Sequence, residues 1–368
     1  MVTETGSLKR AVIDQLTPYV PGKSIEEVRR ELGLSRIIKL ASNENPLGPS
    51  PRAVQAMVKE LQEVHVYPNG KDRQLREAIA DRCGLKPEMV IFSNGEDNIL
   101  TLITQAFLET GEESVVASIT FHAYTTATII AGGRVCPVPL KDYTHDLEAM
   151  LEAINEKTKL VFICNPNNPT GTMVTKGQAD WFMERVGDEV LVIFDEAYGE
   201  YADRDQYPDA VRYVKEGRNV LVLRTFSKLF GLAGVRVGYA LGKPDLIRAL
   251  AAVREPFAVD RIGQAGALAV LEDEEYIRRS KEVNRDGKEF LYRELDRMGL
   301  SYVPTQANFI LVDTGKKAEL VHEAMQREGV IIRPAHHWGL KTKIRVTIGT
   351  REQNQWFISA LQKVLARV

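Results

Sequence analysis

The sequence predicts an α/β protein with a large domain built on a mostly parallel β-sheet and a smaller α+β domain. Three observations support this prediction. Short apolar runs are followed by helical segments through the middle of the chain, and within each run the apolar residues are continuous. Continuous runs are typical of parallel strands that helices cover on both faces. With 368 residues, the chain is also too long for one core of ordinary size.

Helices come first along the chain. Ser24 and Glu27 form a capping box for a helix that Gly33 ends. The expected helices are 8–16, 25–32, 51–63 and 75–83, with a short strand at 37–40. The segment 41–49 is too rich in turn-forming residues for regular structure. It is either a solvated linker or part of a site, because irregular polar segments often carry function.

Strands and helices then alternate. The expected strands are 89–92, 114–118, 135–138, 160–164, 190–194 and 220–223. The expected helices among them are 98–108, 124–131, 147–154 and 176–185. Several of these strands run directly into polar residues. Because ligands bind in the crevice at the carboxyl ends of such strands, these polar residues are candidates for one shared site.

The C-terminal third has a different pattern, with long helices and fewer strands. The expected helices are 263–271, 275–298, 316–328 and 352–365, and the expected strands are 308–312, 331–333 and 343–348. This pattern predicts an α+β module. We therefore expect an N-terminal arm with part of the small domain at 1–40, the large domain at 41–256, and the small domain at 257–368.

Composition narrows the class of protein. A hydrophobic content of 44% and a charged content of 27% are typical of a soluble globular protein. The net charge of −2 gives no electrostatic reason to expect a nucleic acid or an anionic membrane as partner. Cys83, Cys136 and Cys164 are not spaced as metal ligands, so we expect reduced thiols and no metal. The sequence shows neither a signal peptide nor a bilayer-spanning run, so we expect a cytoplasmic protein.

Lys228 is the residue on which the functional interpretation depends. It follows the expected strand 220–223 and lies between Ser227 and a glycine-rich turn. Burial there would disfavour the ammonium ion and leave a nucleophilic amine that can form a Schiff base. Thr225, Ser227 and Arg236 supply two hydroxyls and a guanidinium fork, which suit a phosphate. Together these features indicate pyridoxal 5′-phosphate (PLP). The alternative, an ordinary surface lysine, is not excluded by this motif alone.

Four other polar features have both a structural and a functional interpretation. Glu96 and Asp97 open a helix, where backbone N–H groups favour a phosphate or simply need a cap. Asn168 lies in an Asn-Pro-Thr-Gly turn and presents an amide. Asp195 ends a strand and could cap the next element or pair with a pyridine nitrogen. Tyr124 could belong to the core or stack on a ring.

Motifs along nearly the whole chain resemble the class I/II aminotransferases of PLP fold type I, and within them the histidinol-phosphate aminotransferase family. The matching segments are 16–22, 40–48, 67–68, 165–171, 195–198, 225–228, 231–236 and 344–350. The lysine motif and Asn-Pro-Thr-Gly are specific to the aminotransferases. Tyr19 and the segment 43–48 indicate the narrower family.

The resemblance implies a mostly parallel seven-stranded sheet and a set of cofactor contacts. Lys228 would bind PLP covalently and then move a proton to and from the substrate Cα. Asp195 would pair with the pyridine nitrogen, Tyr198 and Asn168 would bond the ring hydroxyl, and Tyr124 would stack on the ring. The phosphate would be held by backbone amides of Glu96 and Asp97, by Thr225 or Ser227, and by Arg236, with Tyr67 reaching in from the partner in a homodimer.

On the substrate side, the resemblance implies that Arg345 binds the carboxylate or phosphate with help from Tyr19, Asn45 and Arg333. The reaction would be ping-pong transfer between glutamate and 2-oxoglutarate and between imidazole-acetol phosphate and histidinol phosphate. Three departures from the family pattern are Glu96 in place of a small residue, the segment 257–260 without asparagines, and the histidine-rich segment 334–338. An aromatic or specialised amino acid is therefore the alternative substrate, and a decarboxylase or lyase is a less favoured alternative.

Overall fold

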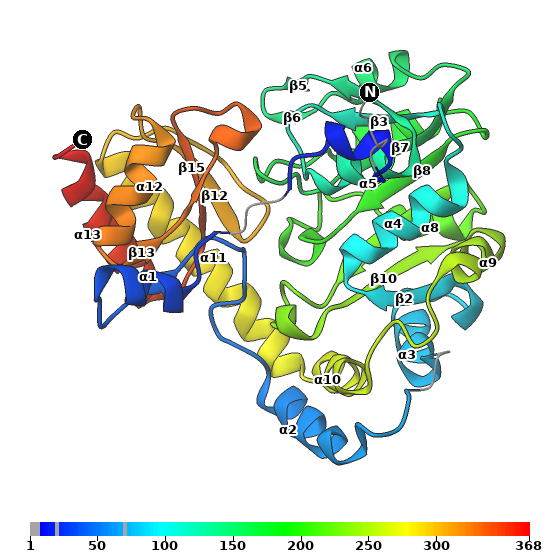
Figure 1. Ribbon diagram of the computed structural model, residues 1–368, viewed down its shortest axis with the longest axis horizontal. Helices are drawn as coiled ribbons and strands as arrows, with labels where there is room; N and C mark the ends of the chain where they lie inside the picture. The colour runs from blue at the N-terminus through cyan, green and yellow to red at the C-terminus, as the bar shows by residue number, and fades with distance from the viewer. Residues whose placement is uncertain (1–7, 19–21, 69–71) are drawn as a thin grey trace, which may run out of the picture.

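The computed structural model describes residues 8–18, 22–68 and 72–368. Two α/β bodies lie side by side, a larger one around a seven-stranded sheet and a smaller one around a four-stranded sheet (Figure 1). This arrangement confirms the predicted fold class. Within the described residues, no helix is long and apolar enough to cross a bilayer.

The seven-stranded sheet has the order β2-β10-β9-β8-β7-β3-β4. Its strands are β2 (Val90–Asn94), β3 (Glu113–Ala117), β4 (Arg134–Val138), β7 (Thr158–Cys164), β8 (Leu191–Asp195), β9 (Val220–Thr225) and β10 (Val237–Gly242). All neighbouring pairs are parallel except those that β10 makes with β2 and β9. A hairpin of β5 (Leu140–Lys141) and β6 (Thr144–His145) lies outside the sheet.

Helices cover both faces of this sheet, which explains its continuous apolar strands. In β7, Val161 and Ile163 belong to the core on one face, whereas Leu160 and Phe162 belong to the core on the other. The helices of the larger body are α2 (Pro51–Glu60), α3 (Arg73–Cys83), α4 (Glu96–Phe107), α5 (Ala123–Ala131), α6 (Leu147–Glu152), α7 (Lys176–Met183), α8 (Ala210–Lys215), α9 (Pro244–Val253) and α10 (Arg261–Leu271). Residues of α4, α5 and α9 pack on one face, and residues of α3, α6, α7, α8 and α10 on the other.

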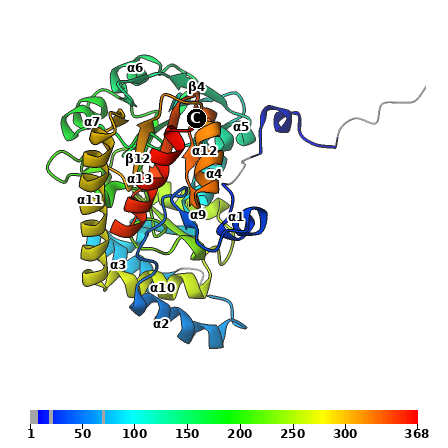
Figure 2. The ribbon, with the colours of Figure 1, turned by 90° about the vertical axis from the view of Figure 1, so that its left-hand side faces the viewer.

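The smaller sheet is antiparallel, with the order β11-β12-β15-β14. Its strands are β11 (Tyr302–Val303), β12 (Phe309–Asp313), β14 (Arg333–Pro334) and β15 (Lys343–Thr347). The helices α11 (Glu274–Arg297), α12 (Ala318–Arg327) and α13 (Arg351–Leu365) cover one face (Figure 2). Ile344 and Val346 point into that helical core, so Arg345 between them faces the opposite way.

N-terminal residues complete the smaller body. The short strand β1 (Ile38–Lys39) pairs in parallel with β13 (Val330–Ile331), and α1 (Ile25–Leu32) packs Val28 against Ile331. Before it, the 3₁₀ helix η1 (Ala11–Gln15) contacts α5.

The change from one core to the other falls inside α11. Tyr276 and Ile277 at its start belong to the core of the larger sheet, whereas Phe290 and Leu291 belong to the core of the smaller one. Figure 1 shows α11 passing from beside α10 into the smaller body. We therefore propose that the domain boundary lies in α11, and that α10 belongs to the large domain although the sequence placed residues from 257 onward in the small one.

Candidate active site

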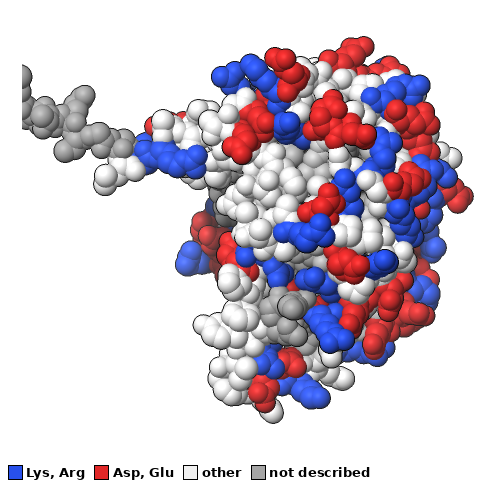
Figure 3. Space-filling view, turned by 90° about the vertical axis from the view of Figure 1, so that its right-hand side faces the viewer, with Lys and Arg blue, Asp and Glu red and all other residues white. Residues whose placement is uncertain are grey.

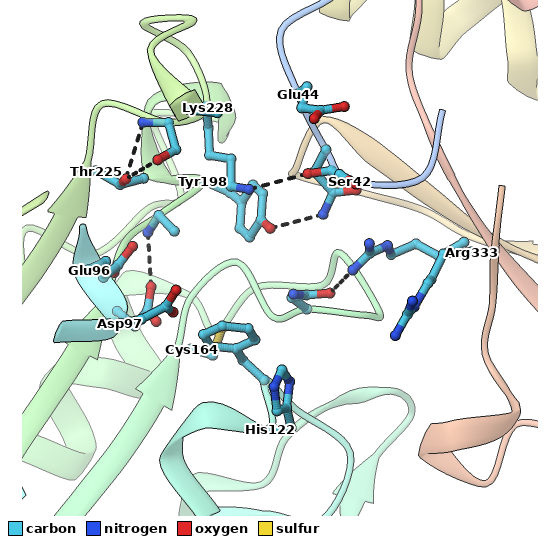
Figure 4. A pocket seen from close by; sticks show the side chains of 18 of the residues that line it. Ser42, Glu44, Glu96, Asp97, His122, Cys164, Tyr198, Thr225, Lys228 and Arg333 are labelled. Carbon is cyan, nitrogen blue, oxygen red and sulfur yellow. Dashed lines mark hydrogen bonds between the residues drawn. The ribbon is translucent and has the colours of Figure 1, made fainter. Parts of the chain in front are cut away.

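A cavity of about 370 Å³ opens between the two bodies. Its walls come from the carboxyl ends of β7, β8 and β9, from the start of α4, from the segment 41–44, and from β14 and β15. Figure 4 shows Lys228 and Arg333 reaching toward it from opposite sides. The segment 41–49, whose sequence allowed either a linker or part of a site, therefore contributes to the site through residues 41–44.

Lys228 follows β9 in a turn that Gly231 closes with a φ of +67°. A Cβ at Gly231 would lie 2.7 Å from the carbonyl oxygen of Gly48, so this close approach requires glycine. The Lys228 amine donates to the carbonyl oxygen of Ser42 over 3.4 Å. Burial, and then the charge of Arg345, lowers the pKa of Lys228 to about 8. At pH 7 about a tenth of this amine is thus neutral, far more than for an ordinary lysine.

Asp195 ends β8 at the base of the cavity and is only 2% exposed. Its Oδ1 accepts from the backbone N–H of Ala197 over 3.0 Å, and its Oδ2 accepts from the hydroxyl of Tyr124. Burial raises the pKa of Asp195, whereas these donors and Glu96 lower it. A buried carboxylate held in this way is suited to pairing with a cationic ring nitrogen.

Tyr198 and Asn168 lie at another wall of the cavity. The amide of Asn43 donates to the Tyr198 hydroxyl over 2.9 Å. Burial raises the pKa of the Tyr198 phenol, which therefore remains a neutral donor. Arg345 donates to Oδ1 of Asn168 over 2.5 Å and to the carbonyl oxygen of Ala41 over 2.7 Å.

The start of α4 forms a cradle for an anion. Gly95 is its N-cap with a φ of +78°, and a Cβ there would lie 2.4 Å from Nη2 of Arg236. Arg236 also lies 3.4 Å from the hydroxyl of Ser227, which accepts from Thr225 over 3.0 Å, and 3.4 Å from Asp97. Backbone N–H groups, two hydroxyls and a guanidinium suit a phosphate.

The residues present therefore fit PLP. The amine with its lowered pKa, the buried carboxylate, the phenol with its neighbouring amide, and the anion cradle all line one cavity of suitable size. They correspond to the aldehyde, the ring nitrogen, the ring hydroxyl and the phosphate of that cofactor.

The structure contradicts the expectation that Tyr124 stacks on the cofactor ring. Tyr124 is fully buried in α5 and is not among the described residues that line the cavity. Its ring stacks on Phe162 at 4.9 Å instead, and its hydroxyl bonds Asp195. Phe121 and His122, just before α5, line the cavity. Neither residue was predicted for the site, although Phe121 is an aromatic residue one helical turn before Tyr124.

Asn45 also differs from its expected role in the substrate pocket. Its amide donates to the carbonyl oxygen of Leu229 over 2.8 Å and to the hydroxyl of Ser280 over 2.9 Å. It is outside the described lining of the cavity and instead ties the segment to the lysine turn and α11. The amide that reaches the site is Asn43, which the sequence analysis did not choose.

The remaining predicted residues are two arginines and Tyr19 for the substrate, and Tyr67 for the cofactor phosphate. Arg333 and Arg345 are direct cross-strand partners in β14 and β15 and both line the cavity. Tyr67 is 79% exposed, lies outside the lining of this cavity, and stacks on Phe257 with a centroid separation of 4.7 Å. Tyr19 lies outside the described residues. The contacts expected of Tyr67 and Tyr19 therefore stay predictions.

Similar proteins share both the sequence and this fold. The family model for aminotransferase class I and II matches residues 35–361. The chain is 49% identical to the histidinol-phosphate aminotransferase of Moorella thermoacetica over 358 residues. These residues are 97% of this chain and 93% of that protein. It is 44% identical to the protein of the same name from Caldicellulosiruptor saccharolyticus, over 97% and 99% of the two chains.

Solved structures agree with this relationship. Histidinol-phosphate aminotransferase from Sinorhizobium meliloti, in complex with pyridoxal-5′-phosphate, has a TM-score of 0.89 and 28% identity over 99% of both chains. An aspartate aminotransferase from Thermus thermophilus, with a TM-score of 0.84 and 23% identity over 98% of this chain and 99% of that chain, shares the fold. The match across almost the whole chain and the fit of the cavity to its cofactor agree: the chain is a PLP-dependent member of the aminotransferase class I and II family.

Proposed function

We propose that the protein transfers the amino group of histidinol phosphate to 2-oxoglutarate, in histidine biosynthesis, by a ping-pong mechanism. The observation that supports this substrate is the pair of arginines on one wall of the cavity. Arg333 and Arg345 are directly opposite each other on antiparallel strands, so their side chains project from the same face. The names of the relatives from Moorella and Caldicellulosiruptor support the same substrate.

Two arginines suit a substrate pair that carries different anions. A guanidinium pairs bidentately with a carboxylate or a phosphate, so Arg345 can serve both glutamate and histidinol phosphate. Arg333 adds the second positive charge that a phosphate dianion requires. Arg345 is only 6% exposed, so its ion pair with a substrate forms largely away from water.

The other residues of the chain orient the cofactor and move protons. PLP, when bound, supplies an aldehyde and an electron-withdrawing ring that favours loss of a substrate proton. We assign Lys228 as the base that takes this proton, because its lowered pKa of about 8 lies close to the operating pH of a general base. Asp195 would keep the ring nitrogen protonated, and Tyr198 with Asn168 would fix the ring hydroxyl. Phe121, which lines the cavity, would serve as the ring platform in place of Tyr124.

We also propose that the active unit is a homodimer with shared sites. Exposed hydrophobic side chains cluster on and after α2 and near Tyr67, namely Val54, Val58, Leu61, Val64, Val66 and Phe257. A second copy that covers this surface would bury apolar area and bring Tyr67 to the other subunit's phosphate cradle. The cysteines of the described chain are all free thiols, which supports a cytoplasmic location.

Mixing two inactive variants tests the shared site. Lys228→Ala and Tyr67→Ala each damage every site of their own homodimers. In a mixed dimer, one site receives both substitutions and the other receives neither. After exchange at equal concentrations, half of the dimers are mixed, so activity should return to about a quarter of the wild-type value. No recovery, with mixed dimers confirmed by mass spectrometry of tagged subunits, contradicts sharing.

A substrate screen that follows the cofactor spectrum tests the function itself. Each half-reaction is measured separately with histidinol phosphate, glutamate, phenylalanine and tyrosine as amino donors. Arg345→Ala should slow all of them by about 30-fold to several thousand-fold, since it removes one partner of a desolvated charge pair. Arg333→Ala should affect histidinol phosphate more than phenylalanine, and Arg327→Ala, an exposed control on α12, should affect none.

The alternatives predict different outcomes of the same screen. Good turnover of aromatic oxo acids without turnover of imidazole-acetol phosphate would favour an aromatic aminotransferase, and His337 and Trp338 in the cavity wall would then be the residues to examine. Release of an amine with carbon dioxide, instead of an oxo acid, would favour a decarboxylase.

A further inference from the structure

Asn167 joins two loops of the cavity from behind the cavity wall. It is fully buried in the turn that carries Asn168 and is not among the described residues that line the cavity. Its Nδ2 donates to the carbonyl oxygen of Ile119 over 3.0 Å and to the hydroxyl of Thr170 over 2.9 Å. Its Oδ1 accepts from the hydroxyl of Thr120 over 2.7 Å. The side chain therefore connects the segment after β3 with the turn after β7.

A buried histidine completes the hydrogen bonding of this amide. His145, in the hairpin strand β6, has its Nε2 at 3.3 Å from Oδ1 of Asn167. Burial lowers the pKa of His145 to about 4, so the ring is neutral at pH 7. Because an amide oxygen can only accept, the proton of the neutral ring lies on Nε2. Two donated and two accepted bonds thus use the full capacity of the Asn167 amide.

The two connected segments carry separate contacts to the cofactor. Phe121 follows Thr120 directly and lines the cavity as the proposed ring platform. Asn168 follows Asn167 directly, lines the cavity, and is proposed to bond the ring hydroxyl. The Oδ1 of Asn168 accepts from Arg345 over 2.5 Å, which leaves its NH2 group for the ring. Since platform and donor must fit one ring, their relative position matters to both contacts.

The smaller body contacts the same two segments. The indole N–H of Trp338 donates to the carbonyl oxygen of Thr120 over 2.9 Å. The backbone N–H of Gln306 donates to the carbonyl oxygen of Gly171 over 2.7 Å. Asn167 bonds both of these residues, Thr120 through its side chain and Gly171 through its carbonyl oxygen over 2.7 Å. The contacts of the smaller body therefore meet at one hydrogen-bonded unit with Asn167 at its centre.

We propose that Asn167 is a positioning residue, which holds the ring platform on segment 119–121 and the hydroxyl donor Asn168 in one fixed geometry around PLP. Aspartate at this position would lack the two donors, and glutamine would add a methylene to a fully buried site. The inference rests on the assignment of PLP and not on the identity of the substrate. Its tests use no substrate, so their outcome is independent of the proposed reaction.

The first test follows the colour of bound PLP against pH. A donor to the ring hydroxyl stabilises negative charge on that oxygen and so lowers the pH midpoint of the colour change. Asn168→Ala should raise this midpoint by about one pH unit, and Asn167→Ala by about half a unit. Asn354→Ala is the matched control, because Asn354 is equally buried and makes two bonds with Gly349 outside the described cavity lining. It should leave the midpoint unchanged.

A double-mutant cycle separates positioning from a general loss of stability. Thr120→Val removes only the hydroxyl that bonds Asn167, and it should raise the midpoint by about 0.3 pH units. In the Asn167→Ala background it should raise nothing further, because that bond is already absent. The dissociation constant of PLP should change by less than about tenfold in each variant, since the contacts of Asn167 do not include the phosphate cradle.

Hydrogen exchange of the cofactor-free protein gives a readout without PLP. Asn167→Ala should speed exchange in the segments 118–123 and 166–172 together and leave α13 unchanged. Asn354→Ala should speed exchange at the start of α13 and in neither of those segments. Faster exchange in only one of the two segments would overturn the connection between them.

The midpoints decide the positioning role. An unchanged midpoint in Asn167→Ala, or a Thr120→Val shift of the same size in both backgrounds, would overturn it. If Asn167→Ala does not fold, Thr120→Val and His145→Phe take its place, because each removes one donor to Oδ1 of Asn167. Both should then raise the midpoint, and an unchanged midpoint in either would overturn the proposal.

Discussion

The amine of Lys228 should react with an aldehyde at a pH at which ordinary lysines do not. Burial and the charge of Arg345 lower its pKa from 10.5 to about 8. Only the neutral amine attacks an aldehyde, so the rate of capture follows the neutral fraction. At pH 7 this fraction is about a tenth, against about three in ten thousand for an unperturbed lysine, which is an advantage of about 300-fold.

The assay measures the rate of PLP capture by the cofactor-free protein between pH 6 and pH 10. Borohydride fixes the product, and peptide mapping locates the label. The rate at Lys228 should rise with a midpoint near pH 8. Exposed Lys141 in the same sample serves as the internal reference, and Lys228→Arg should lose the fast label. Arg345→Gln should move the midpoint upward, because it removes the second cause of the low pKa.

The same shift has a consequence for stability. Below pH 8 the Lys228 amine is mostly charged, and its charge destabilises the folded state because burial disfavours the ammonium ion. Lys228→Met should therefore stabilise the cofactor-free protein by up to about 3 kcal/mol. The gain is smaller than this limit because the Lys228 side chain is only partly buried and cavity water screens it. The advantage should shrink as the pH rises from about 8 to 10.5. A midpoint above pH 10, or preferential label on another lysine, would refute this reasoning.

Three further predictions follow from individual contacts. Asp195→Asn should weaken PLP affinity by less than about tenfold but lower turnover by about 10²–10³, since it removes charge rather than contacts; equal losses in both measurements would indicate a structural role. Arg254→Ala should lower the free energy of unfolding in urea by about 3–5 kcal/mol, because it removes the ion-pair partner 2.9 Å from Asp72, whose side chain is 1% exposed and keeps the neutral amide of Gln264 as a donor; a change below 1 kcal/mol would contradict it. Trp338→Phe should raise the KM for histidinol phosphate by about fivefold with kcat unchanged, since the indole loses its 2.9 Å bond to the Thr120 carbonyl; an unchanged KM would show that the bond does not shape the pocket.

The parallel strands could be predicted closely because their apolar runs are buried on both faces. The expected strand 160–164 corresponds to β7, and 220–223 corresponds to β9, each with small differences at the ends. The sequence analysis did not identify β10. Its sequence, Val-Gly-Tyr-Ala-Leu-Gly, is interrupted by glycines, which are unfavourable in strands. The structure explains Gly238, since a Cβ there would lie 2.5 Å from the backbone nitrogen of Glu96.

In the site, residues at strand ends could be predicted and residues on irregular segments could not. Lys228 and Asp195 follow their strands at the edge where ligands bind, so topology places them. The direction of a side chain in the segment 41–48 depends on the backbone conformation, and Asn43 has a φ of +56° that no local pattern indicates. For the same reason, the choice between Phe121 and Tyr124 depends on how α5 begins and packs on the sheet.

Figure 3 shows Lys and Arg interspersed with Asp and Glu on one face of the molecule. Inside, charges of both signs line the cavity, with Arg236, Arg333 and Arg345 beside Glu44, Asp97 and Asp195. The guanidinium of Arg345 is buried, and a buried guanidinium interacts with a small anion more strongly than a screened surface charge does.

Arg345 contacts both bodies of the protein and lines the cavity between them. It comes from the smaller sheet, donates to Asn168 of the larger body, and donates to Ala41 in the segment that joins the two. Its charge also lowers the pKa of Lys228. A substrate anion bound at Arg345, as proposed, would offset that charge, so the Lys228 amine would become a stronger base when a substrate is present. The residue proposed to recognise the substrate would thus also adjust the proposed base, although Arg345 comes from the smaller body and Lys228 from the larger one.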